Sequence, residues 1–232
     1  TFNSRATIGR TLESILAQTP GCLPQALLIV DNCSTDGTPD VIAEYAQGHG
    51  RVSLIRNSRN VGFARAHNQA LALIDSEFHV ICNPDIVLPD NAFAELRRFM
   101  DHRPDIGIAC PRFTYPDGRL QPLNRRHPTV CDLFLRRFLP RSLQPAFQRR
   151  LAAYEMLDVG YDHACDVPFM TGALMFCRTG ALKKVGGFDE RFFLYFEDAD
   201  LSRRVQALGL RTVYCHLATV THNWQRMAHK DW

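Results

Sequence analysis

The chain has 232 residues, of which 46% are hydrophobic, and a formal net charge of +3. This length and composition exclude a disordered chain and allow one substantial core, and no apolar run is long enough to cross a bilayer. The eight cysteines include no C-x-x-C pair, which argues against a disulfide scaffold or a zinc site and favours a cytoplasmic protein with reduced, buried thiols.

The first half of the chain alternates strand and helix patterns. Short apolar runs predict strands at 26–30, 52–56, 78–82 and 106–110, and apolar spacing predicts helices that begin at Thr38 and cover 62–74 and 90–102. Such alternation predicts an α/β fold with a mostly parallel sheet and helices on both faces. Ligands of these sheets bind beyond the carboxyl ends of the strands, where Asp31-Asn32 and Asn83-Pro84-Asp85 stand.

The pattern changes after Pro111. Residues 125–150 are predicted to be irregular and carry seven arginines against one acid, Asp132. Arginines interleaved with leucine and phenylalanine suit phosphate groups or an anionic membrane surface, and a solvated arm is an equal alternative. Regular structure resumes with strands at 166–170, 173–177 and 212–215 and helices at 179–185 and 199–208. We therefore expect a single domain over 1–232.

Two polar segments follow the first two strands. Residues 31–38 join a strand to a helix, and short polar side chains there can bind a base or ribose, although the spacing alone favours a plain turn capped by Thr38. In the segment 60–68, Gly62 would let a ligand approach the backbone and Arg65 can meet a phosphate. A glycine turn with a surface arginine is the alternative.

The third strand ends in Asn83-Pro84-Asp85. A carboxylate in a rigid turn can hold a divalent cation whose shell diphosphate oxygens complete. An ordinary Asn-Pro turn is an even alternative. His222, near the C-terminus, is a further candidate ligand or phosphate donor, although a lone histidine is more often structural.

An unusual segment begins at Gly187, where aromatic residues lead into three carboxylates and a helix. Helical spacing places Glu197 and Asp198 beside the buried face and points Asp200 away. We expect the aromatic residues to form an apolar wall that desolvates the two acids and raises their basicity, as a general base requires. Helix capping explains one acid but not the aromatic residues before it.

Taken together, these motifs resemble glycosyltransferase family 2, inverting sugar-nucleotide enzymes of the GT-A fold, and most closely its bacterial rhamnosyltransferase-like branch. The resemblance covers nearly the whole chain. The matching segments are Thr1-Phe2-Asn3 at the end of the first-strand motif, 31–38 as the nucleotide-binding loop, Asn60-Val61-Gly62 with Asn68, Asn83-Pro84-Asp85 in place of D-x-D, and Phe196-Glu197-Asp198 as the acceptor-side E-D motif.

The resemblance implies a Rossmann-like GT-A domain whose residues 1–110 bind the nucleotide-sugar and whose residues 111–232 bind the acceptor and catalyse. Asp85 would hold Mg²⁺ or Mn²⁺ against the diphosphate, with His222 reaching the metal. Asp198 would take the proton from the acceptor hydroxyl, and Glu197 would help to place the acceptor or the base. The implied nucleotide-binding residues are Thr1, Asn3, Asn32, Ser34, Asp36, Gly62, Arg65 and Asn83.

Three features depart from the family pattern. Asn83 replaces the first Asp of D-x-D, so that metal binding would depend on Asp85. Asn32 replaces a frequent Asp that pairs with a uracil or thymine edge. The strand before Thr1 is mostly absent, which implies a truncated N-terminal strand and an exposed sheet edge.

The resulting hypothesis is an inverting glycosyltransferase that moves a sugar such as rhamnose from a dTDP- or UDP-sugar to a hydroxyl of a saccharide or lipid-linked glycan. We expect it in the cytoplasm, without a nucleic-acid partner and with a peripheral contact through 125–150 to the inner face of the plasma membrane. The alternative is a non-catalytic nucleotide-sugar-binding domain or partner subunit, which Asn83 and the missing strand favour.

Overall fold

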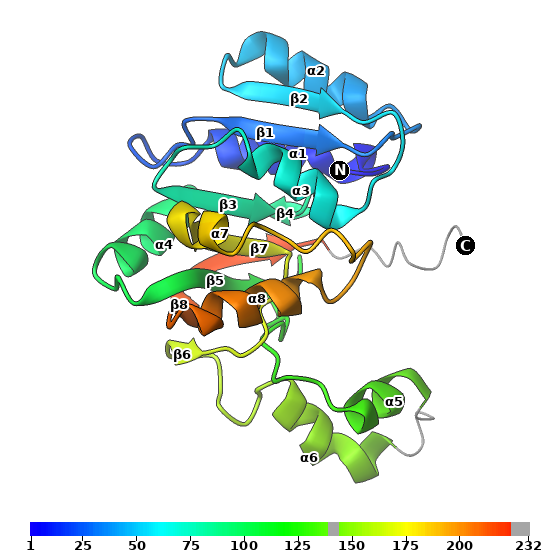
Figure 1. Ribbon diagram of the computed structural model, residues 1–232, viewed down its shortest axis with the longest axis vertical. Coiled ribbons are helices and arrows are strands. Elements are labelled where there is room, and N and C mark those ends of the chain that lie inside the picture. The colour runs from blue at the N-terminus through cyan, green and yellow to red at the C-terminus, as the bar shows by residue number, and fades with distance from the viewer. Residues whose placement is uncertain (139–143, 224–232) are drawn as a thin grey trace.

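The computed structural model describes residues 1–138 and 144–223, whose elements are shown in Figure 1. The helices are α1 (Arg5–Leu16), α2 (Thr38–Gly48), α3 (Phe63–Leu71), α4 (Ala92–Asp101), α5 (Val130–Phe138), α6 (Gln144–Tyr154), α7 (Thr179–Lys184) and α8 (Glu197–Ala207). The strands are β1 (Leu27–Asp31), β2 (Val52–Arg56), β3 (Phe78–Cys82), β4 (Ile86–Val87), β5 (Ile106–Thr114), β6 (Cys165–Asp166), β7 (Leu174–Arg178) and β8 (Arg211–His222).

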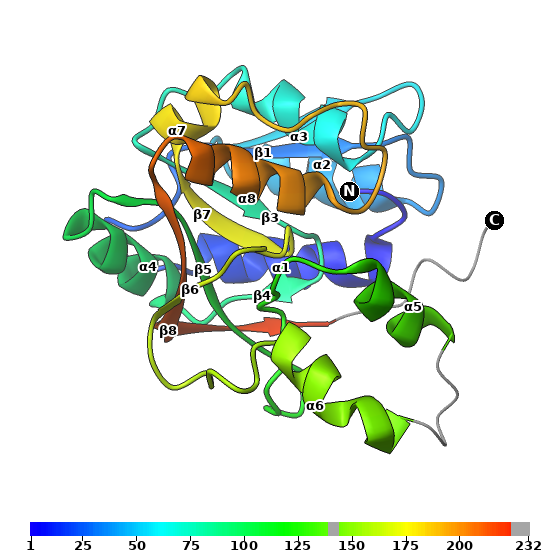
Figure 2. The ribbon, with the colours of Figure 1, turned by 60° about the horizontal axis from the view of Figure 1, so that its bottom comes forward.

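The strands form two hydrogen-bonded sheets that lie side by side in Figure 1. One pairs β1 with β2, and the other has the order β3-β7-β5-β8-β4, with β6 also on β8. The β1–β2 and β5–β8 pairs are parallel, whereas β7 runs antiparallel to both β3 and β5. The chain enters β7 after a long excursion through α5 and α6 rather than a crossover helix (Figure 2). The predicted α/β class is confirmed, with a mixed second sheet.

Helices cover both faces of the strands. Figures 1 and 2 show α3, α7 and α8 on one face and α1 and α4 on the other. The helix predicted at 90–102 is α4, and its predicted apolar stripe is buried. The stripe consists of Phe93, Leu96, Phe99 and Met100, which all face the core. The polar loops at the ends of β1 and β3 remain free to form a site.

Helix α1 is absent from the predicted elements. Its buried residues Ile8, Leu12 and Ile15 follow helical spacing, with Thr11 also buried. The signal is therefore present in the sequence. The helix covers β1 and the start of β4, and the Thr11 hydroxyl donates a hydrogen bond to the Pro84 carbonyl (2.9 Å), next to the candidate metal residue.

Two predictions in the second half are wrong. The section 125–150 contains helices α5 and α6, which lie apart from the sheets in Figure 1, and its one acid, Asp132, is buried and pairs with Arg150 (2.6 Å). The strand expected at 166–170 is reduced to Cys165–Asp166, since Pro168 lacks the N–H that a ladder needs.

The remaining strand predictions are confirmed, and two strands are longer than expected. β5 continues to Thr114 and β8 to His222, which carries this histidine to the end of the sheet. All eight cysteines are free, but the predicted burial holds for only some of them, since Cys110, Cys177 and Cys215 are buried and Cys33 and Cys131 are exposed.

Candidate functional site

A cavity of about 2400 Å³ lies between β1 and β3 and reaches the carboxyl ends of both strands. It collects most of the predicted site residues. Those that line it are Thr1, Asn3, Asn32, Gly62, Asn83, Asp85, Glu197, Asp198 and His222, whereas Ser34, Asp36 and Arg65 do not.

The loop after β1 is organised by Asp31, a fully buried carboxylate that the sequence placed at this edge of the sheet without assigning it a role. It accepts hydrogen bonds from the Thr1 hydroxyl (3.1 Å), the Ser34 amide (3.0 Å) and the Ser34 hydroxyl (2.5 Å). Asp36 accepts from the Thr38 amide (3.0 Å) at the start of α2, and these contacts keep its pKa below the usual range. The side chains of Ser34 and Asp36 thus form hydrogen bonds that hold the loop, rather than lining the cavity as predicted nucleotide contacts would. An acid directly after an apolar run was the available signal for Asp31.

Asn3 and Asn32 line the cavity and are held by neighbouring loops. The Asn3 side-chain oxygen accepts from the Thr35 amide (2.9 Å). The Asn32 amide group donates to the Gly62 carbonyl (3.2 Å), and its oxygen accepts from Asn57 (2.9 Å). Asn32 is therefore oriented by its neighbours and has one remaining donor and one remaining lone pair for a ligand.

Gly62 and Arg65 were predicted to contact a ligand, but in the structure both contact the segment 187–196 of the protein itself. Gly62 has φ +87, and an added Cβ would lie 2.7 Å from the Phe193 carbonyl oxygen. The close approach that its lack of a side chain allows is thus made by this protein's own loop. Arg65 forms an exposed ion pair with Glu190 (2.9 Å) and does not reach the cavity. The sequence could not show that residues 187–196 fold back over α3.

The Asp85 carboxylate lies in a buried polar pair with His222. His222 Nε2 is 3.5 Å from Asp85 Oδ2, while Asp85 Oδ1 is buried without a hydrogen-bond partner. On the other side of the ring, Nδ1 is 2.9 Å from Oε1 of the buried Gln121. An amide oxygen only accepts, so Nδ1 carries a proton and donates to Gln121. Gln121 was not among the candidates, because nothing local in the sequence connects it to His222.

A short series of backbone contacts joins this pair to the carboxylates of α8. The Asn83 amide donates to the Ala173 carbonyl (2.9 Å). The adjacent residue, Gly172, donates its amide to Asp198 Oδ2 (3.0 Å). Asp198 and Asp85 therefore lie on the same cavity, as the enzymatic interpretation requires.

The two acids at the start of α8 have raised pKa values. Burial raises the pKa of Asp198, although the Gly172 and Ala199 amides oppose this shift. Burial raises the pKa of Glu197 from 4.5 to about 7, with a smaller contribution from the negative charge of Asp198. Glu197 Oε2 is buried without a hydrogen-bond partner. Perturbed carboxylates in a cavity are typical of acid–base chemistry.

The aromatic segment predicted to shield these acids lines the same cavity through Phe193 and Tyr195, but its side chains are largely exposed. Phe193, Tyr195 and Phe196 are 50%, 58% and 42% exposed, and Tyr195 and Phe196 have positive φ values of 72 and 67. This left-handed backbone is a costly conformation for aromatic residues, and such strain is commonest at functional sites. On the inner side, Phe63 and Asp198 both lie within 4 Å of the position of a Gly172 Cβ.

Comparisons with known proteins identify the family. The model of glycosyl transferase family 2 matches residues 1–185. An N-acetylglucosaminyl-diphospho-decaprenol L-rhamnosyltransferase of Mycobacterium tuberculosis is 29% identical over 225 residues, which cover 90% of this chain and 69% of that protein. A pre-mycofactocin glycosyltransferase of the same organism is 25% identical over 89% of this chain and 39% of its own length.

Solved structures share the fold. The mannosyltransferase PcManGT from Pyrobaculum calidifontis, in complex with GDP-Man and Mn²⁺, has a TM-score of 0.67 at 19% identity over 99% of this chain and 56% of its own. S. aureus TarS 1–349 in complex with UDP-GlcNAc has a TM-score of 0.66 at 17% identity over 100% of this chain and 60% of its own. This chain thus spans little more than half of either structure. The fold is the GT-A fold that the motifs predicted, and the chain belongs to glycosyl transferase family 2.

Proposed function

We propose that the protein is an inverting glycosyltransferase that moves a sugar from a dTDP- or UDP-sugar to an acceptor hydroxyl. The observation that carries this proposal is the contact series from Asp198 through Gly172, Ala173 and Asn83 to Asp85. Inverting transfer needs a base on one side of the sugar and stabilisation of the leaving diphosphate on the other. The two carboxylates on one cavity supply groups suited to these two tasks.

The residues around Asp85 fit a divalent cation. The unpartnered Asp85 oxygen is an acceptor that a cation would satisfy, and His222 Nε2, 3.5 Å from the other Asp85 oxygen, would offer the cation a nitrogen ligand in its neutral form. Within the described residues, no group of three or more His, Cys, Asp or Glu side chains could hold a metal unaided. Donor diphosphate oxygens would complete the shell, and bound Mg²⁺ or Mn²⁺ would neutralise charge on the leaving group. Asn83, beside Asp85, would contribute only a neutral amide.

Asp198 would act as the base and Glu197 as its helper. Burial makes the Asp198 carboxylate more basic, and both of its oxygens are oriented by backbone amides (3.0 and 2.9 Å). With a pKa of about 7, Glu197 is partly protonated at neutral pH, so that it can donate a hydrogen bond that places the acceptor. The nucleotide would contact Thr1, Asn3, Asn32 and Asn83, which line the same cavity.

The acceptor is proposed to be a saccharide or a lipid-linked glycan, and the sugar to be rhamnose. Support comes from the L-rhamnosyltransferase relative, whose name gives a lipid diphosphate as acceptor. In the described residues, no helix combines the length and apolar character of a membrane span. We expect a lipid-linked acceptor to be met at the membrane surface.

Helix α5 offers a surface for such peripheral contact. Phe134 and Phe138 are 61% and 63% exposed, and their ring centroids are 5.2 Å apart. Arg149 of α6 is also exposed. The side chains of Arg136 and Arg137, and residue Arg141, lie outside the part of the chain that is described. Exposed aromatic residues near basic ones suit an anionic membrane surface.

A ligand screen followed by a transfer assay tests the proposed function. Melting temperatures would be measured with dTDP, UDP and GDP, each with and without Mn²⁺, and we expect dTDP or UDP to raise the melting temperature only when Mn²⁺ is present. Donor hydrolysis or transfer above background would then reject the non-catalytic alternative. Nucleotide binding without either reaction, with acceptors of both classes, would contradict the proposal.

Vesicle co-sedimentation tests the membrane contact. We expect the protein to sediment with phosphatidylglycerol vesicles and less with phosphatidylcholine vesicles. Replacing Phe134 and Phe138 by Ser should weaken this binding, whereas Leu217→Ser, which removes an exposed leucine on β8, should not. Equal sedimentation of both variants would remove α5 from this role.

A further inference from the structure

A chain of three side-chain amides, called the amide chain below, leads from helix α3 to the cavity. Gln69 Nε2 donates to Asn57 Oδ1 (3.0 Å), and Asn57 Nδ2 donates to Asn32 Oδ1 (2.9 Å). The amide chain ends where Asn32 Nδ2 donates to the Gly62 carbonyl (3.2 Å). Of its three side chains only Asn32 lines the cavity, so Gln69 and Asn57 can act on a ligand only through Asn32.

Asn32 and Asn57 stand at equivalent positions after two neighbouring strands. β1 and β2 are parallel, and their last residues, Asp31 and Arg56, are paired. The Asn57 backbone amide donates to the Asp31 carbonyl (2.9 Å), which continues the ladder by one residue. Both side chains therefore extend from the carboxyl edge of the sheet, where ligands of α/β folds bind.

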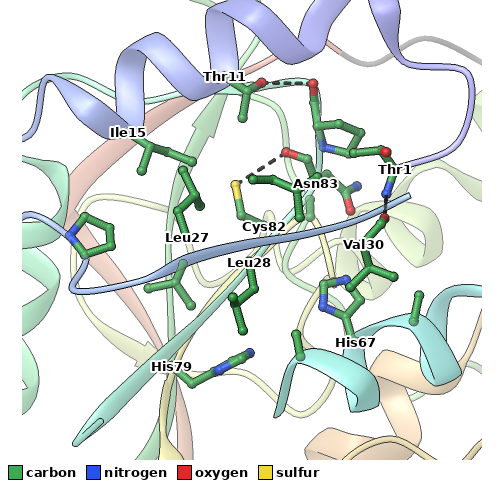
Figure 3. A pocket seen from close by; sticks show the side chains of 18 of the residues that line it. Thr1, Thr11, Ile15, Leu27, Leu28, Val30, His67, His79, Cys82 and Asn83 are labelled. Carbon is green, nitrogen blue, oxygen red and sulfur yellow. Dashed lines mark hydrogen bonds between the residues drawn. The ribbon is translucent and has the colours of Figure 1, made fainter. Parts of the chain in front are cut away.

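The backbone of Asn32 is fixed as well. Its amide donates to the Thr1 carbonyl (2.9 Å), and Figure 3 draws Thr1 beside Val30 at one end of the cavity. Asn32 is only 6% exposed. A side chain so enclosed has little space to change rotamer, and the direction of its amide group is set by its hydrogen-bond partners.

The Gly62 carbonyl sets the direction of the whole amide chain. A carbonyl only accepts, so Asn32 must turn Nδ2 toward Gly62 and Oδ1 toward Asn57. Asn57 must then turn Nδ2 toward Asn32 and Oδ1 toward Gln69. Reversing any one amide would place two oxygens or two N–H groups against each other. Asn32 therefore presents its remaining N–H and its remaining lone pair in a fixed order.

Pyrimidine bases differ in the order of these same groups. Uracil and thymine carry an N3–H donor next to the O4 acceptor, whereas cytosine carries an N3 acceptor next to an amino donor. A fixed amide that pairs with one order meets like groups in the other, while an amide free to reverse would pair with both. The base could not slide to a new register, because the diphosphate of the same nucleotide would be held beside Asp85.

We propose that Asn57 and Gln69 are positioning residues that hold the Asn32 amide in one direction and so select a uracil or thymine base over cytosine. This inference rests on the proposed function, in which Asn32 contacts the nucleotide. It assigns the selectivity to two side chains that do not line the cavity. A buried polar group that meets a like group loses its hydrogen bond, which typically costs a factor of about ten or more in affinity.

Calorimetric titration with UDP and with CDP, each with Mn²⁺, tests the inference, because these nucleotides differ only in the base. We expect the wild-type protein to bind UDP at least about tenfold more tightly than CDP. Asn57→Asp keeps the acceptor for Gln69 but turns an oxygen toward Asn32 Oδ1, so that neither direction of the Asn32 amide satisfies both neighbours. The ratio of UDP affinity to CDP affinity should then fall by at least about fivefold.

Ser58→Asp is the matched control. It adds the same charge at the adjacent residue, whose side chain is exposed, and should leave the affinity ratio unchanged. Melting temperatures without nucleotide show whether each variant is folded.

Gln69→Glu is a second, more remote test. Its carboxylate turns a second oxygen toward Asn57 Oδ1, which favours reversal of Asn57 and weakens its hold on Asn32. The affinity ratio should fall by about two- to fivefold, although residue 69 does not line the cavity. Gln69→Met, which removes the hydrogen bond without favouring reversal, should lower the ratio less.

The outcomes distinguish this inference from the proposed function. Failure of the wild type to bind any nucleotide would contradict the proposed function and this inference with it. Binding of CDP as tightly as UDP would overturn this inference alone, since sugar transfer from a nucleotide would remain possible. An unchanged affinity ratio in both Asn57→Asp and Gln69→Glu would overturn it too and leave the amide chain as a support of the loop.

Discussion

The loop after β1 and the ends of β3 and α8 both place buried polar groups on one cavity, but they differ in how those groups are satisfied. Asp31 is fully buried and holds three donors of its own loop. Asp85 and Glu197 each keep one buried oxygen without a hydrogen-bond partner. A buried polar atom without a partner is costly, so it is retained where a ligand supplies the partner.

This difference separates residues that hold the structure of the site from residues that are suited to bind or react with a ligand. Family motifs place residues of both kinds in one functional set, whereas the contacts divide them. Asp31, whose donors all belong to residues beside its own loop, fixes the shape of that loop, whereas Asp85, Glu197 and Asp198 line the cavity and are suited to bind or react. The following predictions test that division.

The largest effect is expected for Asp198→Asn. An amide cannot accept the proton, so transfer should fall by about 10²–10⁴-fold while nucleotide affinity is kept. Initial rates with labelled donor and binding by calorimetry measure the two quantities. Asp200→Asn is the matched control, since this acid of the same helical turn pairs with Arg204 (2.7 Å), and it should retain most activity. Near-normal turnover in Asp198→Asn would remove this residue from the role of base.

Asp31→Ala should act on stability. The change leaves the Ser34 amide, the Ser34 hydroxyl and the Thr1 hydroxyl without their acceptor, which should lower the free energy of unfolding by about 2–4 kcal/mol. Urea denaturation measures this loss. Asp40→Ala, an exposed acid in the first turn of α2, should cost about 1 kcal/mol or less. Similar losses in both variants would contradict the scaffold role of Asp31.

Glu197→Gln should change the pH dependence of stability. The folded pKa of about 7 lies above the value of 4.5 for an ordinary glutamate. Between these pH values the unfolded state ionises first, so the wild-type protein loses stability as pH rises from about 4.5 to about 7. The variant lacks this loss and should gain on the wild type by about 2–3 kcal/mol over that interval. Urea denaturation at pH 4.5 and pH 7.5 measures the gain, and an unchanged difference would show that Glu197 ionises normally.

Gln121→Leu should weaken cation binding, although Gln121 would act through His222 and not as a ligand itself. The side chain accepts from His222 Nδ1 (2.9 Å), and its loss frees the ring to place its proton on Nε2, which then cannot bind a metal. Mn²⁺ affinity in the presence of dTDP should fall by about 10–100-fold, as read from the signal of free Mn²⁺ in electron paramagnetic resonance. Gln121→Glu keeps the acceptor and should keep the affinity. Ring ¹⁵N shifts of His222 report the tautomer directly, and an unchanged tautomer in Gln121→Leu would contradict this role.

The sequence predicted most of the fold because its elements are local. The strands at 52–56 and 78–82 and the stripe of α4 follow periodicities that burial requires, and the structure keeps them. The helical pair α5 and α6 was hidden by its arginines, since charge obscures an apolar stripe. The two-residue β6 was overestimated, because Pro168 limits the ladder.

The site was predictable only in part. Motif order placed Asp85, Asp198 and His222 on one cavity, but Gln121 and Gly172 act through tertiary contacts with residues 101 and 26 positions away. Tyr195 and Phe196 have a left-handed backbone, which aromatic residues rarely adopt. Composition could not reveal such a conformation.

Anomalous diffraction from crystals soaked with Mn²⁺ and dTDP or UDP tests the central claim most directly. The account predicts a manganese peak beside Asp85 and His222, with the nucleotide diphosphate next to it and the Asp198 carboxylate facing the same space. A diphosphate bound away from Asp85, or a manganese site that does not share its cavity with Asp198, would contradict it.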